Sequence, residues 1–472
     1  MRSSKIYSIL EHFDKYEQNR FRKYLCSPYF NKDETLKQLF EVFLRSINSR
    51  KAVELGKEEI WEGLNIGKAF DDVRFRKYCS DLLKLVEGFL AQQVYEGTPL
   101  HKANFLMQSI GNRKMEELFS GAIRSAKRLS EKEPHKPASY YYYQYEIEKN
   151  YYDLTGFDVK RGQVSNVEAI ANNLDVFYIA EKLRYYCLVL SRQYQLSHEY
   201  EILFIDEIIN HIEKYNYQEV PPVAVYYQIF LALNDSENLD HYFLLKKLLE
   251  KYGLEFPNKE ASNIYTYALN YCTRKINKGH QNFLQEIFDL YVDLLNKEII
   301  LDKGEIIPWH FKNIVTVSLR LGKFGWTENF IMNYGKKLPE TSRENMLTYN
   351  LAQLYFYEKK YNKVIEQLQF VEYTDVTYNI NSKSMLIATY YELEEIEPLY
   401  HLLDSFKVYL NRHKDIADQM KKLYSNLIKF TKKLVKIRPG DKNAIEKIKK
   451  ELEMTKNVAS IRWLREKIAE LE

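Results

Sequence analysis

The chain has few of the residues that interrupt helices, and it lacks the long apolar stretches that cross membranes. Of its 472 residues, 16 are Gly and 11 are Pro. Scarcity of both over this length favours helices over turn-rich β structure. No apolar stretch approaches the ~18 residues that suggest a membrane span. The N-terminus leads directly into the amphipathic run from Ile6 to Tyr16, without the apolar core and cleavage site of a secretory signal, so we expect none.

Cysteine is also scarce and widely spaced. Cys26, Cys79, Cys187 and Cys272 form no CxxC pair. We therefore expect buried free thiols in a reducing cytoplasm rather than a disulfide framework or a redox site. The ten histidines are dispersed and form no short metal-binding spacing, so we expect no metal.

Motifs that carry catalysis or bind nucleotides are missing as well. The chain has no HExxH, GxGxxG or GxSxG. Its formal net charge of +4 is small for this length and by itself indicates neither nucleic acid nor a membrane surface. These absences predict a protein that is not an enzyme and that uses no cofactor.

What the chain does contain is a succession of amphipathic helices, clearest between Pro308 and Leu410. Apolar residues recur at helical spacing from Phe311 to Leu319, Gly322 interrupts them, and a second stripe runs to Pro339. This helix–turn–helix unit has the period of about 34 residues that is typical of helical repeats.

Two further units follow, with turns expected at Lys359-Lys360 and near Glu394-Glu395. Three residue pairs lie 36 positions apart: Ala352/Ala388, Tyr355/Tyr391 and Phe370/Phe406.

These units resemble tetratricopeptide (TPR) repeats. The resemblance rests on Gly322-Lys323-Phe324, on the terminal Pro339, and on Ala352, Tyr355 and Tyr361, whereas Thr327 and Val364 stand where the family prefers Ala. It implies an all-α, right-handed superhelix, or solenoid, of antiparallel helix pairs with a concave groove that binds protein.

Three regions are predicted along the chain. Residues 1–96 form an N-terminal helical cap, residues 97–410 the TPR-like α-solenoid, and residues 411–472 a pair of basic capping helices. Within the solenoid we expect one continuous helix over residues 104–129.

Groove residues are predicted by the resemblance. In TPR-like arrays the first helix of each pair lines the groove, and an Asn before the Leu of that helix often binds the backbone of an extended peptide. Asn313 and Asn350 match this position, and Lys312, Gln353 and Lys383 are candidates beside them. An Asn amide suits a peptide unit because it offers both a donor and an acceptor. Exposed polar positions without a ligand explain the two Asn residues equally well.

The C-terminal helices carry a basic face. Residues 411–450 hold thirteen Lys and Arg against four Asp and Glu. The candidate binding residues on this face are Lys421, Lys422, Lys429, Lys432, Lys433 and Lys436. Such a face suits an acidic partner, anionic lipid or nucleic acid. It also suits a solvated helix that ends a solenoid.

Two aromatic patterns have two interpretations each. Phe21-Arg22-Lys23-Tyr24 recurs as Phe75-Arg76-Lys77-Tyr78, which fits either a nucleic-acid surface or core aromatics beside a wet basic face. A compact helical head before a TPR-like body also occurs in bacterial regulators that bind DNA, which supports the nucleic-acid interpretation by analogy only.

The tyrosines between Tyr140 and Tyr145 fit either a binding surface or packing against helices on both sides.

The sequence thus predicts a cytoplasmic scaffold that binds a protein segment in the groove of residues 308–410. The alternative is a regulator that contacts nucleic acid through its N-terminal helices or its Lys-rich C-terminal face.

Overall fold

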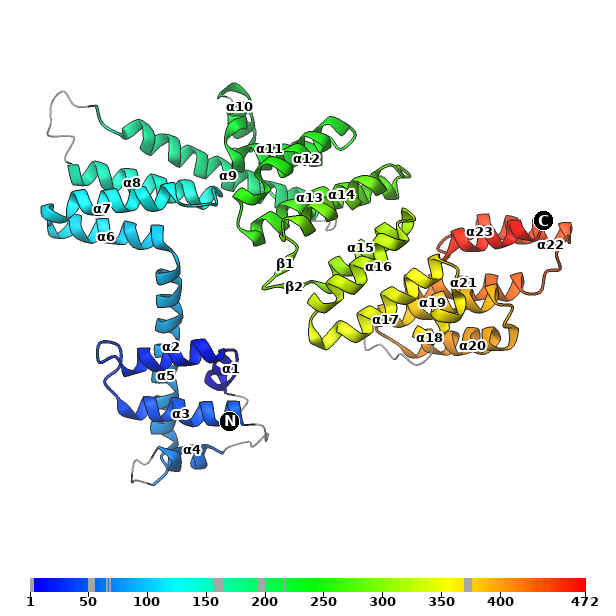
Figure 1. Cartoon of the computed structure of the whole chain (residues 1–472), viewed down its shortest axis with the longest axis horizontal. Coiled ribbons are helices and arrows are strands. Elements are labelled where there is room, and N and C mark those ends of the chain that lie inside the picture. The colour runs from blue at the N-terminus through cyan, green and yellow to red at the C-terminus, as the bar shows by residue number, and fades with distance from the viewer. Residues whose placement is uncertain are drawn as a thin grey trace. The chain divides into compact units, whose positions relative to one another are not determined.

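The computed structural model describes residues 4–49, 56–64, 67, 69–155, 164–193, 200–215, 217–368 and 376–472 (Figure 1). Over this described part the chain contains 23 α-helices and a single hairpin of two-residue strands. The predicted all-α class is confirmed. The chain divides into two compact units, residues 1–134 with 138–178 and residues 135–137 with 179–472.

The first unit holds two helical clusters and the beginning of α9. Its helices are α1 (Lys5–Glu11), α2 (Lys15–Cys26), α3 (Glu34–Asn48), α4 (Lys57–Gly63), α5 (Asp72–Gly97), α6 (Pro99–Arg113), α7 (Glu116–Glu131), α8 (Ala138–Thr155) and the start of α9 (Val167–Gln193). An aromatic core that includes Phe21, Phe40 and Phe75 joins α1 to α5, and a separate apolar core joins α6 to α8.

The prediction of one helix over residues 104–129 is wrong. The helix ends at Arg113 and a new one begins at Glu116, because Lys114 takes a left-handed conformation with φ 52°. The backbone N–H groups of Lys114 and Met115 then bond back to the carbonyls of Gly111 and Ile110, which closes the last turn of α6.

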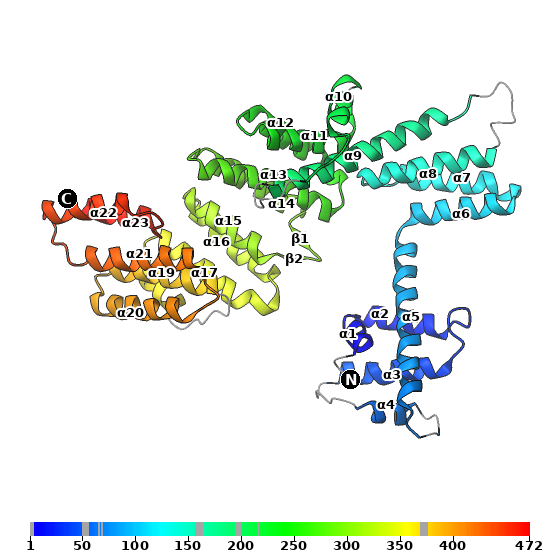
Figure 2. The same cartoon turned by 180° about the vertical axis from the view of Figure 1, so that it is seen from behind.

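The second unit continues with helices arranged in successive pairs (Figure 2). Its elements after α9 are α10 (Ile205–Tyr215), η2 (Tyr217–Glu219), α11 (Pro221–Asn234), α12 (Leu239–Tyr252), η3 (Gly253–Glu255), α13 (Asn258–Asn277), α14 (Phe283–Asn296), β1 (Leu301–Asp302), β2 (Glu305–Ile306), α15 (Pro308–Arg320), α16 (Phe324–Tyr334), η4 (Gly335–Lys337), α17 (Glu340–Tyr357), α18 (Tyr361–Leu368), α19 (Val376–Glu392), α20 (Ile396–Arg412), α21 (Asp418–Leu434), α22 (Lys442–Met454) and α23 (Ile461–Glu470).

Helices that are consecutive in the chain pack against each other, and several alternate helices also pack directly on one another. Each of α11, α13, α15, α17 and α19 packs against the helix that follows it. Helices α11 and α13, α15 and α17, and α17 and α19 also pack against each other directly. Helix α11 therefore lies beside α13, and α15, α17 and α19 lie side by side in a second group.

One turn geometry recurs between the paired helices. Gly322, Lys359 and Glu394 all have positive φ, at 70°, 58° and 60°. In each case the N–H of this residue bonds the carbonyl three positions back, and the next N–H bonds the carbonyl five positions back. The turns expected at these three places are thus present with one shared geometry, although Phe370 of the predicted repeat lies outside the described residues.

Replacing Lys359 by Gly is expected to raise the free energy of unfolding by about 0.5–1 kcal/mol. A left-handed conformation costs a residue with a Cβ about 1–2 kcal/mol, and Gly removes this cost from the folded state. Gly also gives the unfolded chain more backbone entropy, which cancels about 0.4–1 kcal/mol of the stabilisation. Chemical denaturation measures the change. Lys360→Gly serves as the matched control because Lys360, the next residue, does not have positive φ, and this substitution should not stabilise the protein.

The last core of the chain crosses the predicted boundary at residues 410–411. Leu403 and Phe406 of α20 and Leu427 and Phe430 of α21 belong to one buried cluster, which extends to Leu464 and Ile468 of α23. Helices α19 to α23 therefore share a single apolar core.

Candidate binding groove

A cavity of about 440 Å³ lies in the second unit of the chain. Residues from five helices line it, on α15, α17, α19, α21 and α23, and the segment leading into α23 closes one side. We call this cavity the groove. Its lining residues are Lys312, Thr316, Tyr349, Gln353, Phe356, Tyr357, Asn381, Ser384, Met385, Ala388, Leu423, Tyr424, Ala459, Ser460 and Trp463.

Helical periodicity explains which side chains reach the groove. Lys312 and Thr316 lie one turn apart on α15, and Asn381, Ser384, Met385 and Ala388 follow one face of α19 at spacings of three and four residues. Each helix thus contributes one stripe, and the stripes of α15, α17, α19 and α21 meet over a common surface.

The groove combines aromatic walls with a few polar groups. Tyr357 is 42% exposed, and burial raises the pKa of its hydroxyl, partly offset by Arg320 and Arg462. The Nε2 of Gln353 donates to the Tyr349 hydroxyl at 3.2 Å, while its Oε1 is buried and has no hydrogen-bond partner among the described residues. This mixture is typical of sites that bury apolar side chains and fix their backbone with sparse hydrogen bonds.

Of the five predicted groove residues, the structure brings Lys312 and Gln353 into the lining. The Lys312 ammonium lies over the rings of Tyr378 and Tyr349, at 5.0 and 5.9 Å from their centroids, and so links α15 to α17 and α19.

Asn313, Asn350 and Lys383 do not line the groove. Asn313 bonds the buried Tyr291 of α14, whose pKa is raised by burial to about 12 despite that bond. Asn350 is fully buried, and its Nδ2 donates to the Met346 carbonyl at 2.7 Å. Lys383 lies over the ring of Tyr409 on α20, at 5.5 Å. Each of these three predicted residues is adjacent in sequence to a residue that does line the cavity.

The wall formed by Ala459, Ser460 and Trp463 is absent from the sequence prediction. The N–H of Ala459 donates to the Leu423 carbonyl, and the indole N–H of Trp463 donates to Glu392 at 3.0 Å. These residues come from the end of the chain, about 70 positions after α19. Repeat spacing carries no signal for such a long-range contact.

Three of the six predicted basic-face lysines are engaged within the fold. Lys429 and Lys433 both pair with Glu451 of α22, at 2.8 and 2.5 Å, and their hydrogen bonds lower the pKa of that carboxyl. Lys432 pairs with Asp404 of α20 at 2.5 Å. Lys421, Lys422 and Lys436 make no ion pair among the described residues, and Lys422 and Lys436 are exposed.

The repeated aromatic–basic motif joins core residues to local ion pairs. Phe21, Phe75 and Tyr78 are buried. Arg22 pairs with Glu41 of α3 at 2.5 Å, and Arg76 pairs with Asp72 one turn back on α5.

The tyrosines between Tyr140 and Tyr145 are all half-buried on α8. Tyr143 packs against His101 of α6, Tyr140 approaches Ser130 of α7, and Tyr142 packs against Phe177 of α9. They therefore pack against helices on more than one side.

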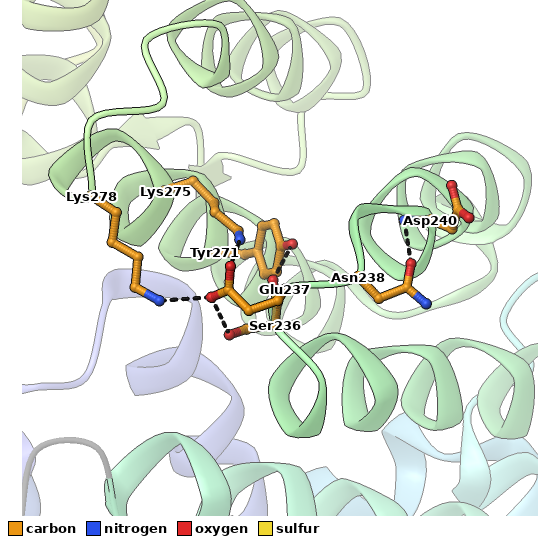
Figure 3. A network of polar contacts seen from close by, with 7 residues as sticks. All are labelled: Ser236, Glu237, Asn238, Asp240, Tyr271, Lys275 and Lys278. Atoms are coloured by element: carbon orange, nitrogen blue, oxygen red, sulfur yellow. Dashed lines mark hydrogen bonds and ion pairs between the residues drawn. The ribbon is translucent and has the colours of Figure 1, made fainter.

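A polar network ties the connection after α11 to the end of α13 (Figure 3). Glu237 accepts hydrogen bonds from Lys278 at 2.8 Å and Lys275 at 3.2 Å, which lower its pKa to about 2. Tyr271 donates to the Ser236 carbonyl at 2.8 Å. Because these contacts all link one loop to one helix, we interpret the network as structural.

The described residues contain no group of His, Cys, Asp and Glu that could hold a metal ion. None of their helices is long and apolar enough to cross a membrane. Cys187 and Cys272 are buried as predicted, whereas Cys26 is exposed because it ends α2 beside a solvent-facing turn.

Comparison with known proteins gives no relative: no protein-family model matches the chain, and no curated protein matches it at a significant level.

Proposed function

We propose that this protein is a non-enzymatic scaffold that binds an extended segment of another protein in the groove, within a TPR-like superhelix. The observation that carries the proposal is the groove itself, one cavity lined by residues from α15, α17, α19, α21 and α23. In a cytoplasmic scaffold of this kind the groove would recognise a protein partner and need no cofactor.

The chemistry of the lining supports a peptide rather than a small metabolite. Tyr357 and the half-buried Trp463 offer rigid aromatic surface, which loses little conformational entropy on binding. Gln353 also lines the cavity and adds a polar amide side chain, a group that suits a peptide backbone. The repeated turn geometry at Gly322, Lys359 and Glu394 supports the repeat architecture.

The alternative of a nucleic-acid regulator has weaker support. Binding to phosphates relies on cations that can exchange counterions, yet Lys429, Lys432 and Lys433 are paired with carboxylates of neighbouring helices. The arginines of the aromatic–basic motif are paired in the same way.

The test is affinity purification with the double variant Tyr357→Ala/Lys312→Ala. Loss of an aromatic anchor in a protein interface typically costs 2 kcal/mol or more, so we expect the captured partner to bind about 30-fold more weakly. Tyr215→Ala is the matched control, because Tyr215 lies on α10, is 57% exposed and does not line the groove. Circular dichroism establishes that all variants keep their helicity.

Two results would contradict the proposal. If the double variant retains the wild-type partner at full affinity, the groove is not the binding site. If the wild-type chain captures no protein above the background of an unrelated bait, the scaffold function itself is wrong.

A further inference from the structure

A second cavity, of about 310 Å³, lies between α9, α11 and α13, apart from the groove. Three tyrosines contribute to its lining: Tyr185, which is 54% exposed, the half-buried Tyr267, and Tyr226, which is 2% exposed. Their rings provide aromatic faces and their positions on three helices form a pocket. Ser191, Thr266 and Asn263 add uncharged polar groups.

One carboxyl group in this cavity, that of Glu260, makes no direct ion pair among the described residues, although the charge of Arg184 acts on it. Glu260 accepts a hydrogen bond from the Tyr226 hydroxyl at 2.8 Å through Oε1. Among the ion pairs of the described residues, none includes Glu260. The pKa of Glu260 is raised, chiefly by burial and also by the charge of Glu181. The hydrogen bond from Tyr226 and the charge of Arg184 oppose this shift. A partly buried carboxylate of this kind is more stable when a positive charge lies next to it.

Arg184 lines the same cavity; its Nη2 is engaged by Glu181 and Tyr185, its Nε is buried without a hydrogen-bond partner among the described residues, and its charge also acts on Glu260. Its Nη2 donates to Glu181 at 2.7 Å and to the Tyr185 hydroxyl at 3.2 Å, and the guanidinium lies over the Tyr185 ring at 4.8 Å. Arg184, Glu181 and Glu260 together carry one net negative charge. Arg192, exposed near the end of α9, acts on Tyr267 and not on Glu260.

We propose that this cavity binds a primary alkylammonium group, with its charge against Glu260 and its aliphatic stem against the tyrosine rings. Aromatic faces attract cations, and a carboxylate beside them accepts the ammonium N–H groups. The same chemistry has two sources, a lysine side chain of a partner protein and a free polyamine. The proposal is independent of the groove.

Calorimetric titration of the full chain tests this site with three probes. Nα-acetyl-lysine amide, with its ε-ammonium free, represents the protein side chain, and spermidine represents the free amine. Nα-acetyl-norleucine amide has a similar aliphatic stem without the charge. We expect the amine probes to bind and the norleucine probe to bind at least tenfold more weakly. The tighter of the two amines identifies the source.

Two charge variants give opposite expected results. Glu260→Gln keeps an acceptor for the Tyr226 hydroxyl but removes the charge, so amine binding should weaken about tenfold or more. Arg184→Gln removes a nearby like charge, so amine binding should strengthen by a few-fold. Glu250→Gln, which does not line the cavity, should leave binding unchanged.

The folded state of Glu260→Gln is checked by thermal unfolding. Because burial raises the pKa of Glu260 in the folded protein, the stability that its neutral form contributes is lost as the pH rises through that pKa. The neutral Gln should therefore melt no lower than the wild type at pH 7. The proposal is overturned if neither amine binds the wild type, if the norleucine probe binds equally well, or if the two variants act in the reverse order.

Discussion

Replacing Phe406 by Ala is expected to lower the free energy of unfolding of the second unit by about 3–5 kcal/mol. The side chain is fully buried in the core shared by α19 to α23, and its ring lies 5.9 Å from that of Tyr424 on the next helix. Truncation removes this contact and leaves a cavity that close-packed neighbours fill only in part.

The matched control is Val408→Ala on the same helix, because Val408 is 46% exposed. Its substitution should change stability by no more than about 0.5 kcal/mol. Urea denaturation followed by circular dichroism measures both variants, with an unchanged slope as evidence that the same unit unfolds. Equal shifts for Phe406→Ala and Val408→Ala would show that α20 does not pack as the structure describes.

The position of Phe406 also bears on the predicted boundary at residues 410–411. The composition changes there, since Lys becomes frequent, and a change in surface charge indicated separate capping helices. Burial gives a different division, because Leu403 before the boundary and Leu427 after it lie in one core. Charge reports what faces solvent, whereas the core is defined by the apolar stripes on the opposite side of the same helices.

The helices themselves could be predicted from the sequence, because apolar stripes at spacings of three and four residues are local signals. The end of α6 could not. Lys114 takes a left-handed conformation at the end of the helix. Gly or Asn usually occupies such a position, so a Lys there gives no sequence signal. The turns at Lys359 and Glu394 were found because the apolar stripes on each side change phase there, although neither residue is a glycine.

Two of the five residues predicted for a groove, Lys312 and Gln353, line the cavity, and Asn313, Asn350 and Lys383 do not. On α17, Tyr349, Gln353 and Phe356 follow one stripe, and Asn350 stands about 100° further around the helix, where it is fully buried. A rule that fixes a residue relative to one Leu is sensitive to such a rotation. The wall at Trp463 was missed because it depends on a contact between residues about 70 positions apart.

That contact leads to the second large effect: Lys467→Ala is expected to destabilise the docking of α23 by about 3 kcal/mol. Lys467 is 5% exposed and pairs with Glu392 and Glu470, both at 2.8 Å. Removing one partner of a buried ion pair costs about 3–5 kcal/mol, because the remaining charge stays buried. The lower end applies here because Glu392 keeps its bond to the Trp463 indole.

The pH dependence of this contribution has a definite sign. Burial lowers the pKa of Lys467, but the hydrogen bonds that its ammonium donates to Glu392 and Glu470 outweigh this effect and raise the pKa above the ordinary value. The stabilisation is therefore complete below the ordinary lysine pKa of about 10.4 and is lost only as the pH rises through the folded value. At neutral pH the wild type and Lys467→Ala should differ by the full amount.

Fluorescence of Trp463, in a chain whose other three Trp residues (Trp61, Trp309 and Trp326) are replaced by Phe, measures the detachment of α23, with the exposed Arg465→Ala on the same helix as control. A further variant, Glu392→Met/Lys467→Met, separates charge from packing, because replacing both members of a buried pair by apolar residues is often nearly neutral. If Lys467→Ala weakens binding of the groove partner and the double variant restores it, the position of the Trp463 wall governs the groove. If Lys467→Ala leaves both the stability and Trp463 unchanged, the buried pair does not hold α23 in place.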